Sequence, residues 1–180
     1  MANVNAPFGF RPTMRTTAGA AGTILNAHKI AGYGTALFMN DVVTHAAAGT
    51  KSTVAIDAAI TPGTTPVAGV NLIYGAASTA TDHAIVLAEN ALFVAQGDGT
   101  GATFLVAASL SKNANLALTA GNTTTKVSKH QISETSIATT NTLDLRVRGL
   151  WQSADNVAGQ YARVYVTFNN LVGSDQKAGI

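Results

Sequence analysis

The sequence predicts an all-β protein, an antiparallel β-barrel or sandwich with an extended N-terminal arm and at most a short helix. Three observations favour this fold class. Short runs rich in β-branched and aromatic residues recur along the chain, Gly, Thr and Asn turns separate them, and only one segment has helical spacing. We expect a single β-rich domain at residues 24–172, preceded by an arm and linker at 1–23 and followed by a C-terminal tail at 173–180.

The first twelve residues are predicted to form the extended arm. Pro7 and Pro12 each fix their own φ angle and bias the preceding residue toward extended geometry. Between them lie Phe8, Phe10 and Arg11, residue types that concentrate binding energy at protein interfaces. Because leaving a phenylalanine in water forgoes roughly 1.5–3 kcal/mol, both rings should pack against something. We expect these three residues to dock on a partner protein, and the alternative is that the arm folds back on its own or a neighbouring subunit.

The rest of the chain is interpreted as short strands joined by turns. Residues 16–23 are rich in Gly, Ala and Thr and form the expected flexible link. The segment 102–110 is Ala-rich and follows a glycine, so helix and strand remain equal alternatives there. The predicted strands are 25–30, 41–45, 53–56, 66–74, 84–88, 91–96, 126–132, 143–150 and 162–168.

Two of these strands are strongly patterned. In 143–150 apolar and charged residues alternate, which places Leu143, Leu145 and Val147 on one face and the charged residues on the other. In 161–168 β-branched and aromatic residues dominate. The stretch between them is polar and has loop chemistry, so we expect the two strands to form a hairpin with a long loop.

The composition is unusually poor in charge. Charged residues make up 11% of the chain, against about 25% in typical soluble proteins, while 33 alanines and 24 threonines supply small side chains. Much of the surface is therefore expected to be small and neutral. Because little charge repulsion opposes the association of such surfaces, the composition favours a protein that packs against other proteins in an assembly.

Composition and patterning argue against several function classes. The absence of cysteine excludes a disulfide framework, a thiol nucleophile and a Cys-based zinc site. The 11 Lys and Arg residues are scattered and the net charge is only +2, so we expect no nucleic-acid partner. The N-terminus has no basic start followed by an apolar run, and apolar segments break within about ten residues, so we expect neither a secretory signal nor a membrane partner.

No pattern predicts a catalytic or cofactor site. The glycine-dense segment 97–101 lacks the Lys and Ser or Thr that complete a phosphate loop, and it is interpreted as a turn. The four histidines lack metal-ligand spacing, there is no Gly-x-Ser-x-Gly motif, and Glu89 and Glu134 are the only glutamates. We therefore expect the protein not to be an enzyme, with no catalytic residue, no metal and no cofactor.

Four aromatic residues near the C-terminal end allow two interpretations. They are Trp151, Tyr161, Tyr165 and Phe168. If they faced solvent they would make a platform for a sugar, but packing in the core is the commoner fate of aromatic residues and is what we expect.

Several segments resemble the small cement (decoration) proteins of tailed-phage capsids. Toward the N-terminus these are the arm at 6–12, Gly32-Tyr33-Gly34 ahead of Asp41-Val42-Val43, and Val67-Ala68-Gly69-Val70. Toward the C-terminus they are Leu145-Arg146-Val147-Arg148-Gly149-Leu150, Asp155-Asn156 and the closing run Val164-Tyr165-Val166-Thr167-Phe168-Asn169-Asn170. The resemblance extends from residue 7 to residue 171, while 74–82 and the tail at 173–180 depart from the family.

The resemblance implies a structural role in the virion. It implies a homotrimer on the outer surface of an icosahedral head, assembled in the host cytoplasm and seated at local three-fold positions. There it would clamp neighbouring major capsid proteins, which with the other copies of the chain are the expected partners. The alternative is a phage tail-associated or receptor-binding β module that recognises carbohydrate through exposed aromatic residues.

Overall fold

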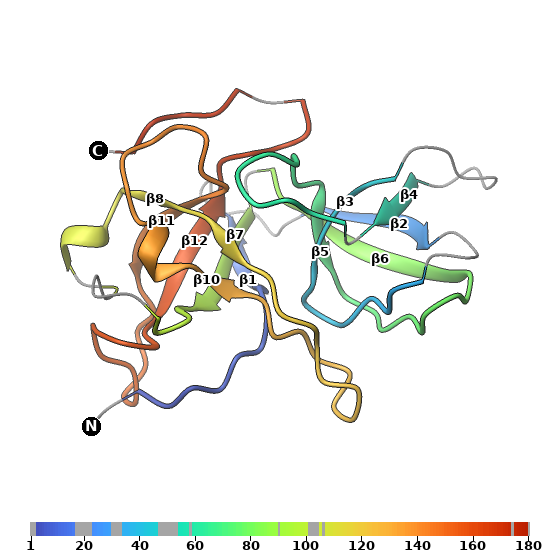
Figure 1. Ribbon diagram of the computed structural model, residues 1–180, viewed down its shortest axis with the longest axis horizontal. Helices are drawn as coiled ribbons and strands as arrows, with labels where there is room; N and C mark the ends of the chain where they lie inside the picture. Colours follow the sequence, from blue (N-terminus) through green and yellow to red (C-terminus); the bar gives the residue numbers. More distant parts are fainter. Residues whose placement is uncertain are drawn as a thin grey trace.

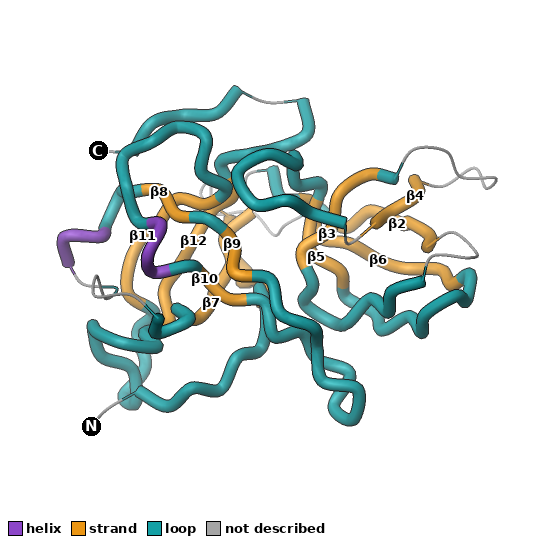
Figure 2. The backbone as a smooth tube through the Cα atoms, viewed as in Figure 1, coloured by secondary structure: helices purple, strands orange, loops and turns teal. Residues whose placement is uncertain are grey.

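The computed structural model describes residues 3–16, 23–29, 34–46, 54–57, 59–89, 91–100, 105, 107–173 and 175–179. These residues form two lobes side by side, a sheet lobe and a barrel lobe (Figures 1 and 2). Within the described ranges helical structure is limited to two 3-10 turns, Ala107–Ser109 and Glu134–Ser136. The predicted all-β fold with at most a short helix is therefore confirmed. No helix in this part of the chain is long and apolar enough to cross a membrane.

The sheet lobe is built on a five-stranded antiparallel sheet with the strand order β1-β7-β12-β11-β8. The strands are β1 (Arg11–Thr16), β7 (Ala91–Gln96), β12 (Arg163–Phe168), β11 (Leu145–Leu150) and β8 (Asn113–Ala114). A separate two-stranded ribbon pairs β9 (Leu116–Ala117) with β10 (Gln131–Ile132). β1 lies at an edge of the sheet, where a proline is tolerated because the ladder loses no hydrogen bond on the open side. It also lies within 1–23, so residues 11–16 of the predicted arm and linker form a strand of the sheet, and most of the expected flexible link at 16–23 lies outside the described residues.

The barrel lobe is a closed barrel with the strand order β2-β4-β3-β5-β6. The strands are β2 (Ile24–Lys29), β4 (Val54–Asp57), β3 (Val42–His45), β5 (Gly69–Asn71) and β6 (Thr81–Leu87). β2 and β4 run parallel, and the other pairs are antiparallel. The whole barrel lies in the connection between β1 and β7, which pair with each other and bring Thr16 opposite Ala91.

A continuous core joins the two lobes because several barrel strands are buried on both faces. Successive side chains of a strand point to opposite sides. On β3, Val43 packs in the barrel interior while Val42 packs in the core shared with the sheet lobe. On β6, Ile85 packs in the barrel interior and Val86 packs in the shared core. The barrel therefore presents an apolar outer face to the sheet lobe, which explains why these segments are apolar throughout rather than alternating.

Some predicted strands are shorter in the structure than the sequence pattern suggests. Strand 66–74 is reduced to β5, which ends where the Asn71 side chain donates a hydrogen bond to the Ile73 carbonyl and turns the chain. Strand 126–132 is reduced to β10, because Lys126 has a positive φ of 62° and is incompatible with a strand. The ambiguous segment 102–110 lies partly outside the described residues and contains the first 3-10 turn.

The inward face predicted for β11 is confirmed for Leu145 and Val147, which are 0% and 1% exposed. The predicted outward position of the Asp144 charge is wrong, because this residue is fully buried just ahead of the strand. Its carboxylate accepts hydrogen bonds from the Gly63 N–H at 2.9 Å and the Leu116 N–H at 3.2 Å. Burial is compensated by these donors, which come from segments far away in the sequence.

The C-terminal segment lies against the sheet lobe. The Asn113 amide donates to the Lys177 carbonyl at 2.8 Å, and the Arg146 guanidinium donates to the same carbonyl at 3.1 Å. Beyond it, the Gly179 N–H donates to the Thr139 carbonyl at 2.9 Å. The predicted tail contains no strand, yet its described part is hydrogen-bonded to the domain beside the β8 edge.

We predict that Leu145→Ala lowers the free energy of unfolding by about 2–5 kcal/mol, because it leaves a cavity in a packed core. The matched variant on the opposite face is Arg148→Ala, whose side chain is exposed and whose loss is expected to cost less than about 1 kcal/mol. Urea unfolding of both variants checks this. Equal losses would contradict the orientation of β11.

Candidate docking groove

The arm residue Phe10 is buried in the core of its own chain. It is 0% exposed, and its ring centroid lies 5.5 Å from that of Phe168, which in turn is 5.1 Å from Phe93. The Phe10 N–H donates to the Asn40 carbonyl, which links the arm to the segment just before β3 of the barrel lobe. The predicted docking role of Phe10 is therefore wrong, since a side chain without exposed surface cannot contact a partner. For this residue the alternative, folding back on its own core, is what the structure has.

The arm before Phe10 is held by side-chain hydrogen bonds rather than by a sheet ladder. Gln96 is 2% exposed and uses its amide to accept from the Ala6 N–H at 3.1 Å and to donate to the Val4 carbonyl at 2.8 Å. Asn3 donates to the Val157 carbonyl and accepts from the Val157 N–H. Because both ends of this stretch are tied to the sheet lobe, the arm is part of the fold.

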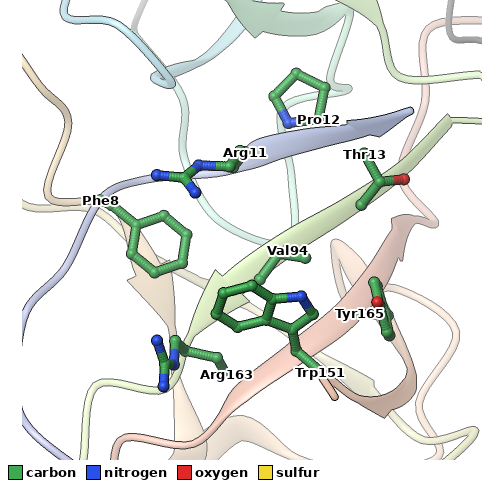
Figure 3. A pocket seen from close by; sticks show the side chains of 8 residues that line it. All are labelled: Phe8, Arg11, Pro12, Thr13, Val94, Trp151, Arg163 and Tyr165. Atoms are coloured by element: carbon green, nitrogen blue, oxygen red, sulfur yellow. The ribbon is translucent and has the colours of Figure 1, made fainter. Parts of the chain in front are cut away.

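Phe8 and Arg11, the other two predicted docking residues, lie at a groove on the outer face of the sheet (Figure 3). The groove has a volume of about 410 Å³, within the usual range for ligand sites. Phe8 is half-buried and Arg11 is exposed. The residues that line it are Phe8, Arg11, Pro12, Thr13, Val94, Trp151, Arg163 and Tyr165. We call it the arm groove.

The strand registers explain how the arm groove forms. Arg11 of β1 is directly opposite Val94 of β7, and Val94 is directly opposite Tyr165 of β12. Directly opposite residues share a face, so a short valine lies in a row between two long side chains and makes the floor. The row continues to Gly149 of β11, where an added Cβ would meet no atom within 4 Å. The groove is therefore open on the Gly149 side.

The electrostatics of the arm groove are cationic. The Arg11 guanidinium lies 5.3 Å from the Phe8 ring centroid, and the Arg163 guanidinium lies 4.7 Å from that of Trp151. Arg163 is also paired with Asp155 at 2.8 Å, and hydrogen bonds from Ser153 and from Arg163 lower the pKa of this carboxyl. Arg11 has no carboxylate partner among the described residues. The lining itself contains two cations and no anion.

Of the four aromatic residues considered for a sugar platform, two line the arm groove. Trp151 and Tyr165 are half-buried there. Phe168 is 5% exposed and belongs to the core. Tyr161 packs its ring against Gly99, where a Cβ would come within 2.3 Å of it. Expected core packing is thus confirmed for Phe168 and is wrong for Trp151 and Tyr165, and the four residues do not form one platform.

Sequence reasoning missed Arg163, Val94, Thr13 and the lining role of Pro12. The signal for Arg163 was local, because it alternates with the inward-facing Val164 just as Tyr165 alternates with Val166. No local sequence pattern marks Val94, because its position on the groove floor depends on the register of β7 with β1 and β12.

A buried polar pair, Asp41 and His130, lies away from the arm groove. His130 Nε2 is 3.4 Å from the Asp41 carboxylate, and His130 Nδ1 accepts from the Val42 N–H at 3.3 Å. Burial lowers the pKa of His130 and raises that of Asp41. The nearby Ser128 hydroxyl accepts a hydrogen bond from the His130 backbone N–H at 3.1 Å, and within the described residues no hydroxyl is hydrogen-bonded to the imidazole as a nucleophile would be. In the described ranges no three His, Asp or Glu side chains come together as metal ligands.

Glu134 is a second buried ionisable group. It is 0% exposed, and within the described residues neither of its carboxyl oxygens has a hydrogen-bond partner of normal geometry. The backbone groups of Gly99 and Tyr161 lie near enough to lower its pKa, but by less than burial raises it. Burial, and secondarily the nearby Asp98, raise the pKa of Glu134 to about 7. The carboxyl fits only because residue 97 is glycine, where a Cβ would lie 2.0 Å from an oxygen of Glu134. No local sequence signal marks this burial.

Comparison with known proteins found no relative of this chain. The chain matches no protein-family model, no curated protein and no solved structure.

We predict that Phe10→Ala lowers the free energy of unfolding by about 3–5 kcal/mol, because it empties the space beside Phe168. Phe8→Ala is the matched variant, and its half-buried ring should cost about 1 kcal/mol. Chemical unfolding of both proteins measures the difference. If the two losses were equal, Phe10 would not be a core residue.

We predict that Glu134→Gln flattens the dependence of stability on pH. The folded-state pKa of about 7 lies above the ordinary value of 4.5, so the folded protein holds this proton more readily than the unfolded chain. The stability from the protonated carboxyl is complete below pH 4.5 and is lost as pH rises through about 7. The wild type should therefore lose more stability between pH 5 and pH 8 than the variant.

The measurement is urea unfolding of both proteins at the two pH values. Glu89→Gln serves as the control, because it makes the same substitution at an exposed carboxyl outside the core. Identical pH dependence in wild type and Glu134→Gln would show that Glu134 is not the group responsible.

Proposed function

We propose that the chain is a structural virion protein that binds the outer surface of an icosahedral phage capsid and stabilises it. It does so by clamping neighbouring major capsid proteins. The observation that carries this proposal is the arm groove, a half-open cationic and aromatic site whose lining includes Phe8 and Arg11. Aromatic residues and arginine are the types enriched where protein interfaces concentrate their binding energy.

The rigidity of the groove supports a docking role. Its floor belongs to a hydrogen-bonded sheet, and its arm wall is held by Gln96 and by the buried Phe10. A site that is already ordered loses little conformational freedom on binding, so more of the contact energy appears as affinity. A protein that stabilises a capsid needs a rigid contact site, because a flexible site would deform without holding the capsid proteins together.

A trimer fits the same role. Charged residues make up only 11% of the chain, so self-association meets little repulsion. One interface repeated around a three-fold axis closes the assembly. Three grooves on one rigid particle would then bind at high effective concentration after the first contact, which makes weak individual contacts sufficient.

A second candidate is a phage tail-associated or receptor-binding module that recognises carbohydrate. Its specific support is the half-buried position of Trp151 and Tyr165 on the outer face of the sheet. Aromatic faces of this kind can pack against sugar rings. Binding to a glycan array, without binding to heads, would favour this candidate over the first.

We predict that the purified protein has three times the 18.3 kDa chain mass in light scattering after size exclusion. It should also co-sediment with phage heads that were assembled without it, and raise the temperature at which they open. An unrelated β protein of similar size is the control. A monomer at micromolar concentration would refute the trimer, and heads that neither bind nor gain stability would refute the capsid role.

A further inference from the structure

We propose that the arm groove receives an extended acidic segment of the capsid protein, with one carboxylate paired to Arg11. The identity of this partner rests on the proposed function, whereas the chemistry of the segment follows from the groove. Three features carry the inference: an unpaired cation, an excess of hydrogen-bond donors, and an opening across the strands.

The unpaired cation is Arg11. Of the two guanidinium groups in the lining, that of Arg163 is neutralised by Asp155 at 2.8 Å, whereas Arg11 faces no carboxylate in the described part of the chain. Arg11 lies over the face of the Phe8 ring, and its N–H groups make no hydrogen bond to the residues that the structure describes, which leaves them open to a ligand. A planar guanidinium matches a carboxylate with two parallel hydrogen bonds, so an acidic side chain completes the site.

Two of the hydrogen-bond donors in the groove have no acceptor in the described part of the chain. The indole N–H of Trp151 and the hydroxyl of Tyr165 have no partner within the described residues. The Thr13 hydroxyl already donates to the Leu92 carbonyl at 2.9 Å. The lining contains no Asp, Glu, Asn or Gln, so its side chains offer few acceptors for the hydroxyl groups of a sugar. Peptide carbonyls and carboxylates supply acceptors, and this favours a polypeptide over a neutral saccharide.

A nucleic acid would also supply anions and rings, but the charge of the site is too small. Binding a nucleic-acid backbone requires several cations in one place, because affinity comes from the release of counterions. The arm groove offers a single unpaired arginine, and the net charge of the chain is +2. One carboxylate flanked by apolar residues is the better match.

The shape indicates how the segment lies. The row Arg11, Val94 and Tyr165 crosses three strands and opens at Gly149. A segment entering at Gly149 would cross the Val94 floor and bring its acidic side chain to Arg11. Its apolar side chains would contact the rings of Phe8, Trp151 and Tyr165, which surround the floor (Figure 3).

Trp151 makes the site directly observable, because it is the only tryptophan of the chain. Its emission therefore reports on the arm groove alone. The experiment uses an array of overlapping peptides that tile the major capsid protein, probed with the wild type, Arg11→Glu and Lys177→Glu. Lys177 is exposed and lies outside the groove, so its variant is the control for the same change of net charge.

Bound peptides should carry Asp or Glu between apolar residues and should shift the Trp151 emission. Arg11→Glu should weaken them by about tenfold, Lys177→Glu should not, and replacing the peptide's acidic residue by Lys should restore binding to Arg11→Glu. Absence of bound peptides, bound peptides without acidic residues, or equal binding by Arg11→Glu would each overturn the inference. So would preferential binding of a saccharide or of oligothymidylate, tested in the same emission assay.

Binding to whole heads separates this inference from the proposed function. If the wild type does not bind heads, the capsid role fails. If the wild type and Arg11→Glu bind heads equally well, the capsid role stands and the docking role of the arm groove is overturned.

Discussion

The burial of Phe10 is the interaction on which the outer face of the sheet lobe depends. Its ring packs with Phe168 in the core that also contains barrel residues, so one side chain joins the arm, the sheet and the barrel. Gly9 beside it has a φ of 74° and lies so close to Asn40 that a Cβ would be 2.5 Å from the Asn40 carbonyl oxygen. With Phe10 held inward, its neighbour Arg11 must point outward, which places a cation beside Phe8 at the groove.

Local periodicity was enough to predict the fold class and the inward residues of β11. It predicts Leu145 and Val147 correctly because buried apolar residues alternate with arginines in the first half of β11. It could not predict the closed barrel, because the parallel pairing of β2 with β4 and the burial of barrel strands on both faces depend on tertiary contacts. The prediction that Asp144 points outward is wrong for the same reason. The N–H groups that compensate its burial belong to Gly63 and Leu116, which are distant in the sequence.

The candidate site could be predicted only in part. Arg11 and Phe8 were found because a cation and an aromatic residue between prolines are unusual, whereas Phe10 was misassigned because a core anchor and an interface anchor have the same composition. The floor at Val94 depends on the register of three strands that are far apart in sequence. No window of the chain contains that information, so a sequence pattern could suggest a contact surface without describing its shape.

The placement of the barrel between β1 and β7 has a consequence for how such a chain can be rebuilt. Thr16 and Ala91 are opposite each other, so the chain leaves the sheet and returns to it at the same point. Residues between them could in principle be exchanged for a tight turn without moving the other strands. The shared core limits such an exchange. Val42, Val70 and Val86 pack in the core of the sheet lobe, so removing them would expose apolar residues of the sheet to water. The barrel is therefore inserted in the connection between two neighbouring strands and also covers one face of the sheet that they belong to.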